Sequence, residues 1–194
     1  MKLDTHDIRF EEETHTYFVD GLIYPSVSQI LAPLNDFSQV DKDVLERSKL
    51  FGQAVHKMVE LDVLGTLDED SIDKSLMPYF HQFRDFRALV NFDTRNAQVE
   101  RVVIDHKLKY AGRLDILAPI HDRPALIDIK TGARIPRTVG PQTWAYKNAL
   151  GTKVDRYCLH LRSDDWALTE LKNDDEDASI FLSCYNIYNF RRKK

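Results

Sequence analysis

The chain has 194 residues, of which 43% are hydrophobic and 30% are charged, and its net charge is −4. This length and composition predict a single globular domain over residues 1–194, with enough apolar side chains to form a core. The acidic balance argues against a protein that coats nucleic acid non-specifically, but it does not exclude a nuclease, because metal-binding acids can coexist with a local basic groove.

Several other classes are excluded by what the sequence lacks. No apolar run is long enough to span a membrane, and the polar N-terminus does not resemble a signal peptide. The two cysteines, Cys158 and Cys184, are too few for a disulfide framework or for a four-thiolate iron–sulfur cluster. We therefore expect a cytoplasmic protein with buried free thiols, no iron–sulfur cluster and no membrane association.

The first predicted elements are a small antiparallel meander over residues 8–24 and a short helix after it. Asp20-Gly21 is a hairpin turn signal within the meander. Ser26 followed by Gln29 has the spacing of a capping box, and Pro33 ends the helix. The hydroxyls of Ser26 and Ser28 could instead contact a phosphate, but capping is the simpler interpretation.

A long helix is predicted over residues 41–64 by a stripe at helical spacing, formed by Val44, Ser48, Phe51, Val55 and Val59. Gly52 and His56 are four residues apart, so they lie on the same side of this helix. A glycine inside a helix costs about 1 kcal/mol relative to alanine. Close approach of another backbone or of a ligand near His56 would explain that cost, although His56 taken alone fits an ordinary core or surface histidine better.

A second, structural helix is predicted over residues 69–90, and a strand over residues 98–104. Glu100 would share a face of this strand with Val102 if the strand is regular. If Glu100 is buried, a polar neighbour or a metal must satisfy its carboxylate. An exposed carboxylate at a sheet edge is the alternative.

Residues 109–132 predict a hairpin that carries groups unsuited to a sheet interior. The expected register places Asp115 opposite Asp128 and Arg113 opposite Lys130. Facing carboxylates repel unless a cation lies between them, and hard oxygen ligands suit Mg²⁺ or Mn²⁺. A neighbouring lysine could orient or deprotonate a water, or neutralise a phosphate, which suits phosphodiester hydrolysis. The simpler alternative is a surface hairpin with an Asp–Lys cross-strand pair.

The loop that follows carries Arg134, a candidate member of a basic groove, and a helix is predicted to begin near Pro141. Gln142 and Tyr146 lie four apart on one face of that helix, where they could contact a phosphate or a base. The remaining elements are two strands and a final helix, over residues 154–161, 167–171 and 173–190. The whole pattern predicts an α/β fold with a central mixed sheet flanked by helices and a small N-terminal β-hairpin.

Five motifs occur in order along the chain: Gly52-x-x-x-His56, Glu100, Gly112-x-x-Asp115, Asp128-Ile-Lys130-Thr-Gly and Gln142-x-x-x-Tyr146. This ordered set resembles the RecB-like branch of the PD-(D/E)XK nuclease superfamily, and residues 15–31 resemble the start of its small phage or prophage members. The resemblance implies a restriction-endonuclease-like core. It also implies a divalent-metal-dependent DNA nuclease, foremost an exonuclease, that acts in recombination or repair.

The resemblance also implies roles for single residues. It implies a Mg²⁺ or Mn²⁺ site whose ligands are His56, Asp115, Asp128 and the carbonyl of Ile129. The candidate catalytic residues are Asp115, Asp128, Glu100, which supports the metal site, and Lys130, which positions the attacking water. The candidate DNA contacts are Gln142, Tyr146, Arg113, Thr131 and Arg134.

DNA, single- or double-stranded, is the expected partner, and a recombinase, a single-strand-binding protein or a helicase are candidate protein partners. Two alternatives stay open: a structure-specific or single-strand endonuclease with the same metal site, and a non-catalytic nucleic-acid-binding subunit of the same fold.

Overall fold

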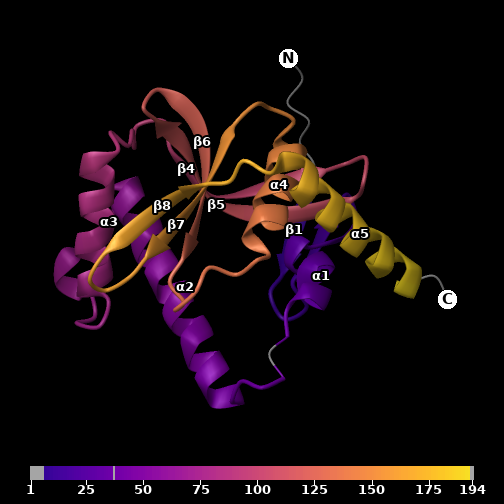
Figure 1. Cartoon of the computed structure of the whole chain (residues 1–194), viewed down its shortest axis with the longest axis horizontal. Coiled ribbons are helices and arrows are strands. Elements are labelled where there is room, and N and C mark those ends of the chain that lie inside the picture. Colours follow the sequence, from indigo (N-terminus) through magenta and orange to yellow (C-terminus); the bar gives the residue numbers. More distant parts are fainter. Residues whose placement is uncertain (1–6, 37, 193–194) are drawn as a thin grey trace.

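The computed structural model describes residues 7–36 and 38–192. In this part of the chain a five-stranded sheet separates two helical layers. Its strands lie in the order β4 (Gln98–Asp105), β5 (Tyr110–Ile120), β6 (Arg123–Lys130), β7 (Asp155–Leu161) and β8 (Trp166–Glu170). Helices α2 (Lys42–Leu64) and α3 (Met77–Leu89) cover one face, and helices α1 (Val27–Leu31), α4 (Val139–Leu150) and α5 (Asp174–Arg192) lie toward the other. A separate three-stranded sheet near the N-terminus lies beside α1 (Figure 1). The prediction of an α/β fold with helices around a mixed sheet is therefore confirmed.

The N-terminal sheet has three antiparallel strands, β1 (Ile8–Glu11), β2 (Thr16–Val19) and β3 (Leu22–Pro25), which confirms the predicted meander. Asp20 and Gly21 both have positive φ, 51° and 76°, as a tight two-residue hairpin turn requires. This sheet packs against the main sheet through a small apolar cluster that includes Ala111 of β5.

Helix α1 (Val27–Leu31) begins with the predicted capping box. The N–H of Gln29 donates to Oγ of Ser26 at 3.1 Å, and the N–H of Ser26 donates to Oε1 of Gln29 at 3.0 Å. Ser26 also forms an isolated bridge with Ala111, which ties the start of α1 to the main sheet. A short 3-10 helix, Ala32–Leu34, contains Pro33 and ends the segment.

Helix α2 (Lys42–Leu64) matches the predicted range, capped by Asp41 and ended by Gly65. Its stripe is buried only in the second half: Val55 and Val59 are in the core, whereas Val44 is 45% exposed. The N-terminal half of the helix therefore extends past the core, and its side chains there are not needed for core packing.

The predicted helix over residues 69–90 is wrong in its first part. Glu69–Ser71 is a 3-10 turn, and α3 spans Met77–Leu89. Pro78 explains the late start, because proline is accepted in the first turn of a helix but disrupts a helix interior. Three phenylalanines bury α3 against the sheet, namely Phe80, Phe83 and Phe86, while Leu89 is 66% exposed.

The main sheet is mixed, because β6 (Arg123–Lys130) and β7 (Asp155–Leu161) are parallel and the other neighbours are antiparallel. The remaining strands are β4 (Gln98–Asp105), β5 (Tyr110–Ile120) and β8 (Trp166–Glu170). The predicted register between β5 and β6 is confirmed over the paired part, from Ile120–Arg123 to Ile116–Ile127.

The pairing between β4 and β5 is interrupted at Glu100 and Asp115. Glu100 has a φ of +49°, which is unusual for a side chain in a strand. Val99 and Ile116 pack on the α2–α3 side, whereas Val103 and Leu114 pack on the opposite side. Residues an even number apart share a face of a regular strand. The side chains of both strands therefore switch from one face of the sheet to the other at this one step, which we call a change of phase. The strand is not regular at Glu100, so Glu100 does not have the place that a regular strand predicts for it.

The layer opposite α2 and α3 includes α4 (Val139–Leu150) and α5 (Asp174–Arg192). Arg156 of β7 is 1% exposed and joins the two helices, because it donates to the carbonyl of Gly140 at 2.8 Å and pairs with Asp177 at 2.8 Å. Cys158 and Cys184 are buried free thiols, as expected. Among the described helices, none is both long and apolar enough to cross a membrane.

Candidate metal centre

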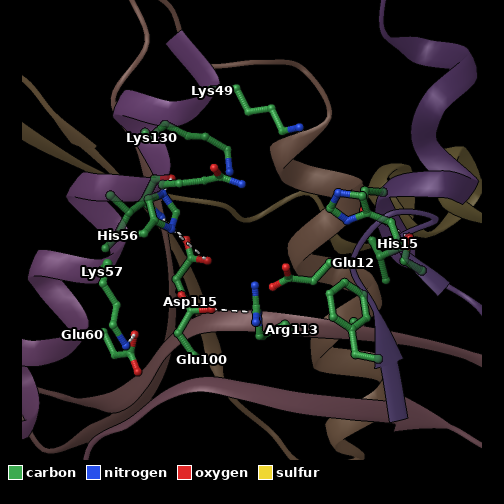
Figure 2. A pocket seen from close by; sticks show the side chains of 18 of the residues that line it. Glu12, His15, Lys49, His56, Lys57, Glu60, Glu100, Arg113, Asp115 and Lys130 are labelled. Atoms are coloured by element: carbon green, nitrogen blue, oxygen red, sulfur yellow. Dashed lines mark hydrogen bonds and ion pairs between the residues drawn. The ribbon is translucent and has the colours of Figure 1, made fainter. Parts of the chain in front are cut away.

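A cavity of about 980 Å³ lies between α2, the N-terminal sheet and the ends of β5 and β6. Eight of the predicted site residues line it: His56, Glu100, Arg113, Asp115, Ile129, Lys130, Thr131 and Tyr146. Figure 2 shows His56 and Asp115 directed toward one another, with Glu12 and His15 of the N-terminal sheet on the far side.

A ring of three contacts joins His56, Asp115 and Ile129. Nδ1 of His56 lies 3.5 Å from Oδ1 of Asp115, and Nε2 of His56 donates to the carbonyl oxygen of Ile129 at 3.1 Å. The N–H of Ile129 donates in turn to Oδ2 of Asp115 at 2.7 Å. A side chain from α2, one from β5 and the backbone of β6 are thus fixed relative to one another.

Glu100 completes a group of potential metal ligands. One ligand atom each from His56, Glu100 and Asp115 lie within 4.8 Å of one another, a distance that one cation can bridge. Nε of Arg113 lies 2.8 Å from Oε2 of Glu100 and orients that carboxylate. The pairing of β5 with β6 ends at Ile116 and Ile127, so Arg113 is not paired with Lys130 as the simple register predicted.

Asp128 and Lys130 lie directly behind this group. Asp128 is 1% exposed, which excludes the alternative of a surface Asp–Lys pair. Nζ of Lys130 is 2.6 Å from Oδ2 of Asp128, whereas Oδ1 is a buried oxygen without a hydrogen-bond partner among the described residues. A buried carboxylate that accepts so few hydrogen bonds is suited to binding a cation. Asp128 is outside the group of three closest potential ligands.

The charges of the site are strongly coupled. Burial acts to lower the pKa of His56, but the charge of Asp115 and the contact with it raise this pKa to about 9. Burial acts to raise the pKa of Asp115, but the charge of His56 outweighs it and lowers the pKa. Burial, and then repulsion by Asp115, raise the pKa of Glu100.

The buried pair behind the group is shifted as well. Burial raises the pKa of Asp128 to about 6, against the attraction of Lys130. Burial acts to lower the pKa of Lys130, but the charges of Asp128 and then Asp115 raise it. The three carboxylates outnumber the two cationic side chains beside them, so the group has an excess of negative charge that attracts a divalent cation.

The donor set fits Mg²⁺ or Mn²⁺. Carboxylate and carbonyl oxygens are ligands that both ions accept, and an imidazole nitrogen favours Mn²⁺. The residues that would hold the ion are His56, Glu100, Asp115 and the carbonyl of Ile129, with Asp128 next to them.

The predicted DNA contacts divide into two groups. Thr131 and Arg113 line the cavity, and Tyr146 reaches it although that residue is only 5% exposed. Gln142 donates through Nε2 to the hydroxyl of Tyr146 at 3.0 Å, so it acts on the cavity through that tyrosine. Arg134 is exposed in the following loop and is not among the residues that line the cavity.

Sequence reasoning missed two parts of the cavity wall. One is the face of α2 formed by Ser48, Lys49 and Gln53, which the helical spacing from His56 could have revealed. The other is the loop of the N-terminal sheet that carries Glu12 and His15. No local signal indicates it, since its place depends on how that sheet packs against β5.

No protein-family model and no curated protein matches the sequence. The solved structures that are similar at low sequence identity include the following two. A crystal structure of SSO0001 matches at 15% identity with a TM-score of 0.39, over 62% of this chain and 61% of that chain, so less than two thirds of its length is covered. An alkaline exonuclease from Laribacter hongkongensis matches at 11% identity with a TM-score of 0.49, over 87% of both chains.

Proposed function

We propose that this protein is a divalent-metal-dependent nuclease that hydrolyses phosphodiester bonds of DNA, foremost as an exonuclease of the RecB-like PD-(D/E)XK branch. One observation carries the proposal: His56, Glu100 and Asp115 come from three separate elements and place ligand atoms within 4.8 Å of one another. They do so on the wall of a cavity that also contains Lys130 and the carbonyl of Ile129.

When bound, a divalent cation would supply charge neutralisation for the phosphate and lower the pKa of the attacking water. The cation would be held by His56, Glu100, Asp115 and the carbonyl of Ile129. The buried carboxylate of Asp128 would contribute a further negative charge next to these ligands. The protein contributes the geometry, since Asp115 is fixed by the N–H of Ile129 and Glu100 by Arg113.

Lys130 supplies a positive donor next to the reacting phosphate. Its Nζ is held by Asp128 at 2.6 Å and its side chain is 21% exposed, so the ammonium group reaches the cavity from a fixed position. From there it orients a water by donating to it, or stabilises negative charge on the phosphate. Arg113 is 48% exposed and stands on the other side of Glu100, where it can donate to a second phosphate oxygen.

The decisive test is metal-dependent degradation of DNA by purified variants. Asp128→Ala and Lys130→Ala are expected to abolish Mg²⁺- or Mn²⁺-dependent degradation of linear DNA and to keep the native circular dichroism spectrum. Asp122→Asn changes an exposed carboxylate in the turn of the same hairpin and should retain full activity. Full activity in both site variants would refute the assignment. Lack of any nuclease activity and of Mn²⁺ binding in the unmodified protein would instead favour a non-catalytic subunit.

A comparison of substrates separates an exonuclease from an endonuclease. An exonuclease degrades end-labelled linear DNA and leaves closed single- and double-stranded circles intact, whereas cutting of circles would favour the endonuclease. For an exonuclease we further propose a cytoplasmic role in recombination or repair, of the kind found in phages, together with a recombinase, a single-strand-binding protein or a helicase.

A further inference from the structure

Gly52 stands in the interior of α2, and nothing in the described part of the protein requires a glycine there. A Cβ built at this position would meet Oγ1 of Thr131 at 3.5 Å, an ordinary van der Waals contact. Two other glycines are different: a Cβ at Gly112 would lie 2.5 Å from Cε1 of Tyr146, and one at Gly140 would lie 2.1 Å from Oδ1 of Asp177. Packing within the protein therefore explains Gly112 and Gly140 but leaves Gly52 unexplained.

The location of Gly52 supplies a reason. It lines the cavity one helical turn before His56, about 6 Å along the axis of α2. A glycine in this position destabilises a helix relative to alanine. What it provides in return is a bare backbone surface that another chain can approach more closely than any side chain would allow.

The side chains around Gly52 suit a sugar–phosphate backbone. Ser48, Lys49 and Gln53 line the cavity on the same face of α2 and offer a hydroxyl, an ammonium and an amide group. Lys49 makes no ion pair within residues 7–36 and 38–192, whereas Lys57 is held by Glu60 at 2.8 Å. Lys49 and His56 extend from α2 toward the same space (Figure 2).

We propose that the substrate strand crosses α2 at Gly52, with its sugar–phosphate backbone in direct contact with the Cα of Gly52. Lys49 binds a phosphate next to the one at His56. This inference rests on the proposed function, and it assigns to the first turns of α2 the task of positioning the strand that the site cleaves. Gly52 and Lys49 are thus positioning residues, and the metal site does not depend on them.

The test combines thermal unfolding with binding of a fluorescent single-stranded oligonucleotide, followed by anisotropy in Ca²⁺, with a gel to show that the probe stays intact. Gly52→Ala should raise the melting temperature by about 2–4 °C, because alanine is the better helix former. The same variant should bind the oligonucleotide about tenfold more weakly, and Gly52→Val should bind it more weakly still, as the added atoms fill the contact surface. Affinity for Mn²⁺ should not change.

The Gly52 and Lys49 variants each have a matched control. Gly140→Ala should lower the melting temperature, since its added Cβ meets Asp177, and this shows how a glycine required by packing behaves. Lys49→Ala should weaken binding and lower the salt dependence by about one phosphate contact, whereas Lys42→Ala, an exposed lysine at the start of the same helix, should do neither.

The outcomes separate this inference from the proposed function. If the protein hydrolyses DNA but Gly52→Ala and Gly52→Val bind the oligonucleotide with unchanged affinity, the role of Gly52 is overturned. A lower melting temperature of Gly52→Ala would overturn it as well. Binding that depends on Gly52 and Lys49 without any hydrolysis by the unmodified protein would support the inference and overturn the nuclease assignment.

Discussion

The carboxylate of Asp115 accepts a hydrogen bond from the backbone N–H of Ile129 at 2.7 Å. This bond joins β5 and β6 just beyond the last paired residues, Ile116 and Ile127. A side chain here takes the place of the sheet's own pairing. One oxygen of Asp115 therefore holds the strand ends together, while the other faces His56.

The role of Asp115 in metal binding can be tested separately from its role in stabilising the fold. Asp115→Asn should keep an oxygen that accepts from Ile129, because an amide retains a carbonyl, but it loses the negative charge. We expect Mn²⁺ affinity, measured by titration calorimetry, to fall by about 100-fold or more, since the effect of losing a ligand charge should exceed that of losing a supporting contact. The unfolding midpoint in urea should change little, and Asp122→Asn is the matched control. Unchanged Mn²⁺ affinity in Asp115→Asn would remove this carboxylate from the metal site.

Arg156 should be among the most costly residues to truncate. Its guanidinium group is buried and pairs with Asp174 at 2.7 Å and Asp177 at 2.8 Å. Arg156→Ala would leave these carboxylates without their partner, which should cost about 3–5 kcal/mol of unfolding free energy in a urea titration. Arg123→Ala breaks an ion pair with Asp155 on an arginine that is 65% exposed, and should cost less than about 1 kcal/mol. Similar costs for the two variants would contradict the role given to burial.

Gly112 and Tyr146 should be coupled energetically. A Cβ at Gly112 would lie 2.5 Å from the ring of Tyr146 and 3.1 Å from Cγ2 of Val27, so Gly112→Ala must displace the tyrosine. The expected cost in unfolding free energy is about 1–3 kcal/mol. In a double-mutant cycle with Tyr146→Ala, the cost of Gly112→Ala should become smaller, because the ring closest to the new methyl group is gone and only the contact with Val27 remains. Strictly additive effects would show that the contact is relieved in some other way.

Cys158 should be unreactive in the folded protein. It is fully buried, and burial raises the pKa of its thiol from 9.0 to about 12. Alkylation by iodoacetamide at pH 8 should therefore modify it only after addition of denaturant, since the thiolate is the reacting form. A raised pKa in the folded state also means that the unfolded chain loses this proton first, so the unfolding free energy should fall as pH rises above about 9. Cys158→Ser should reduce that fall, and rapid alkylation of the folded protein would contradict the burial.

Predictions from the sequence succeed where the cause is local. The turn at Asp20-Gly21, the capping box of Ser26 and Gln29, and the β5–β6 register all depend on residues within a few positions of one another. The late start of α3 was also a local signal, in Pro78, that the predicted helix over residues 69–90 overlooked. These features fix the main elements and bring Asp115 and Asp128 to the same end of the sheet.

The remaining features depend on distant parts of the chain. The interruption at Glu100 and Asp115 arises between two strands at once, so neither strand reveals it alone. The placement of Glu12 in the cavity wall depends on how the N-terminal sheet meets β5. Packing of this kind has no periodic pattern in the sequence, and only the folded arrangement shows it.

The joint change of phase in β4 and β5 has an evolutionary consequence. Because the side chains of both strands switch faces at the same step, a single inserted or deleted residue in either strand would point core residues outward and carry Glu100 or Asp115 away from His56. Only a matched change in both strands could restore the arrangement. The lengths of these two segments should therefore vary together or not at all among descendants of the same ancestor, even where their amino acids diverge freely.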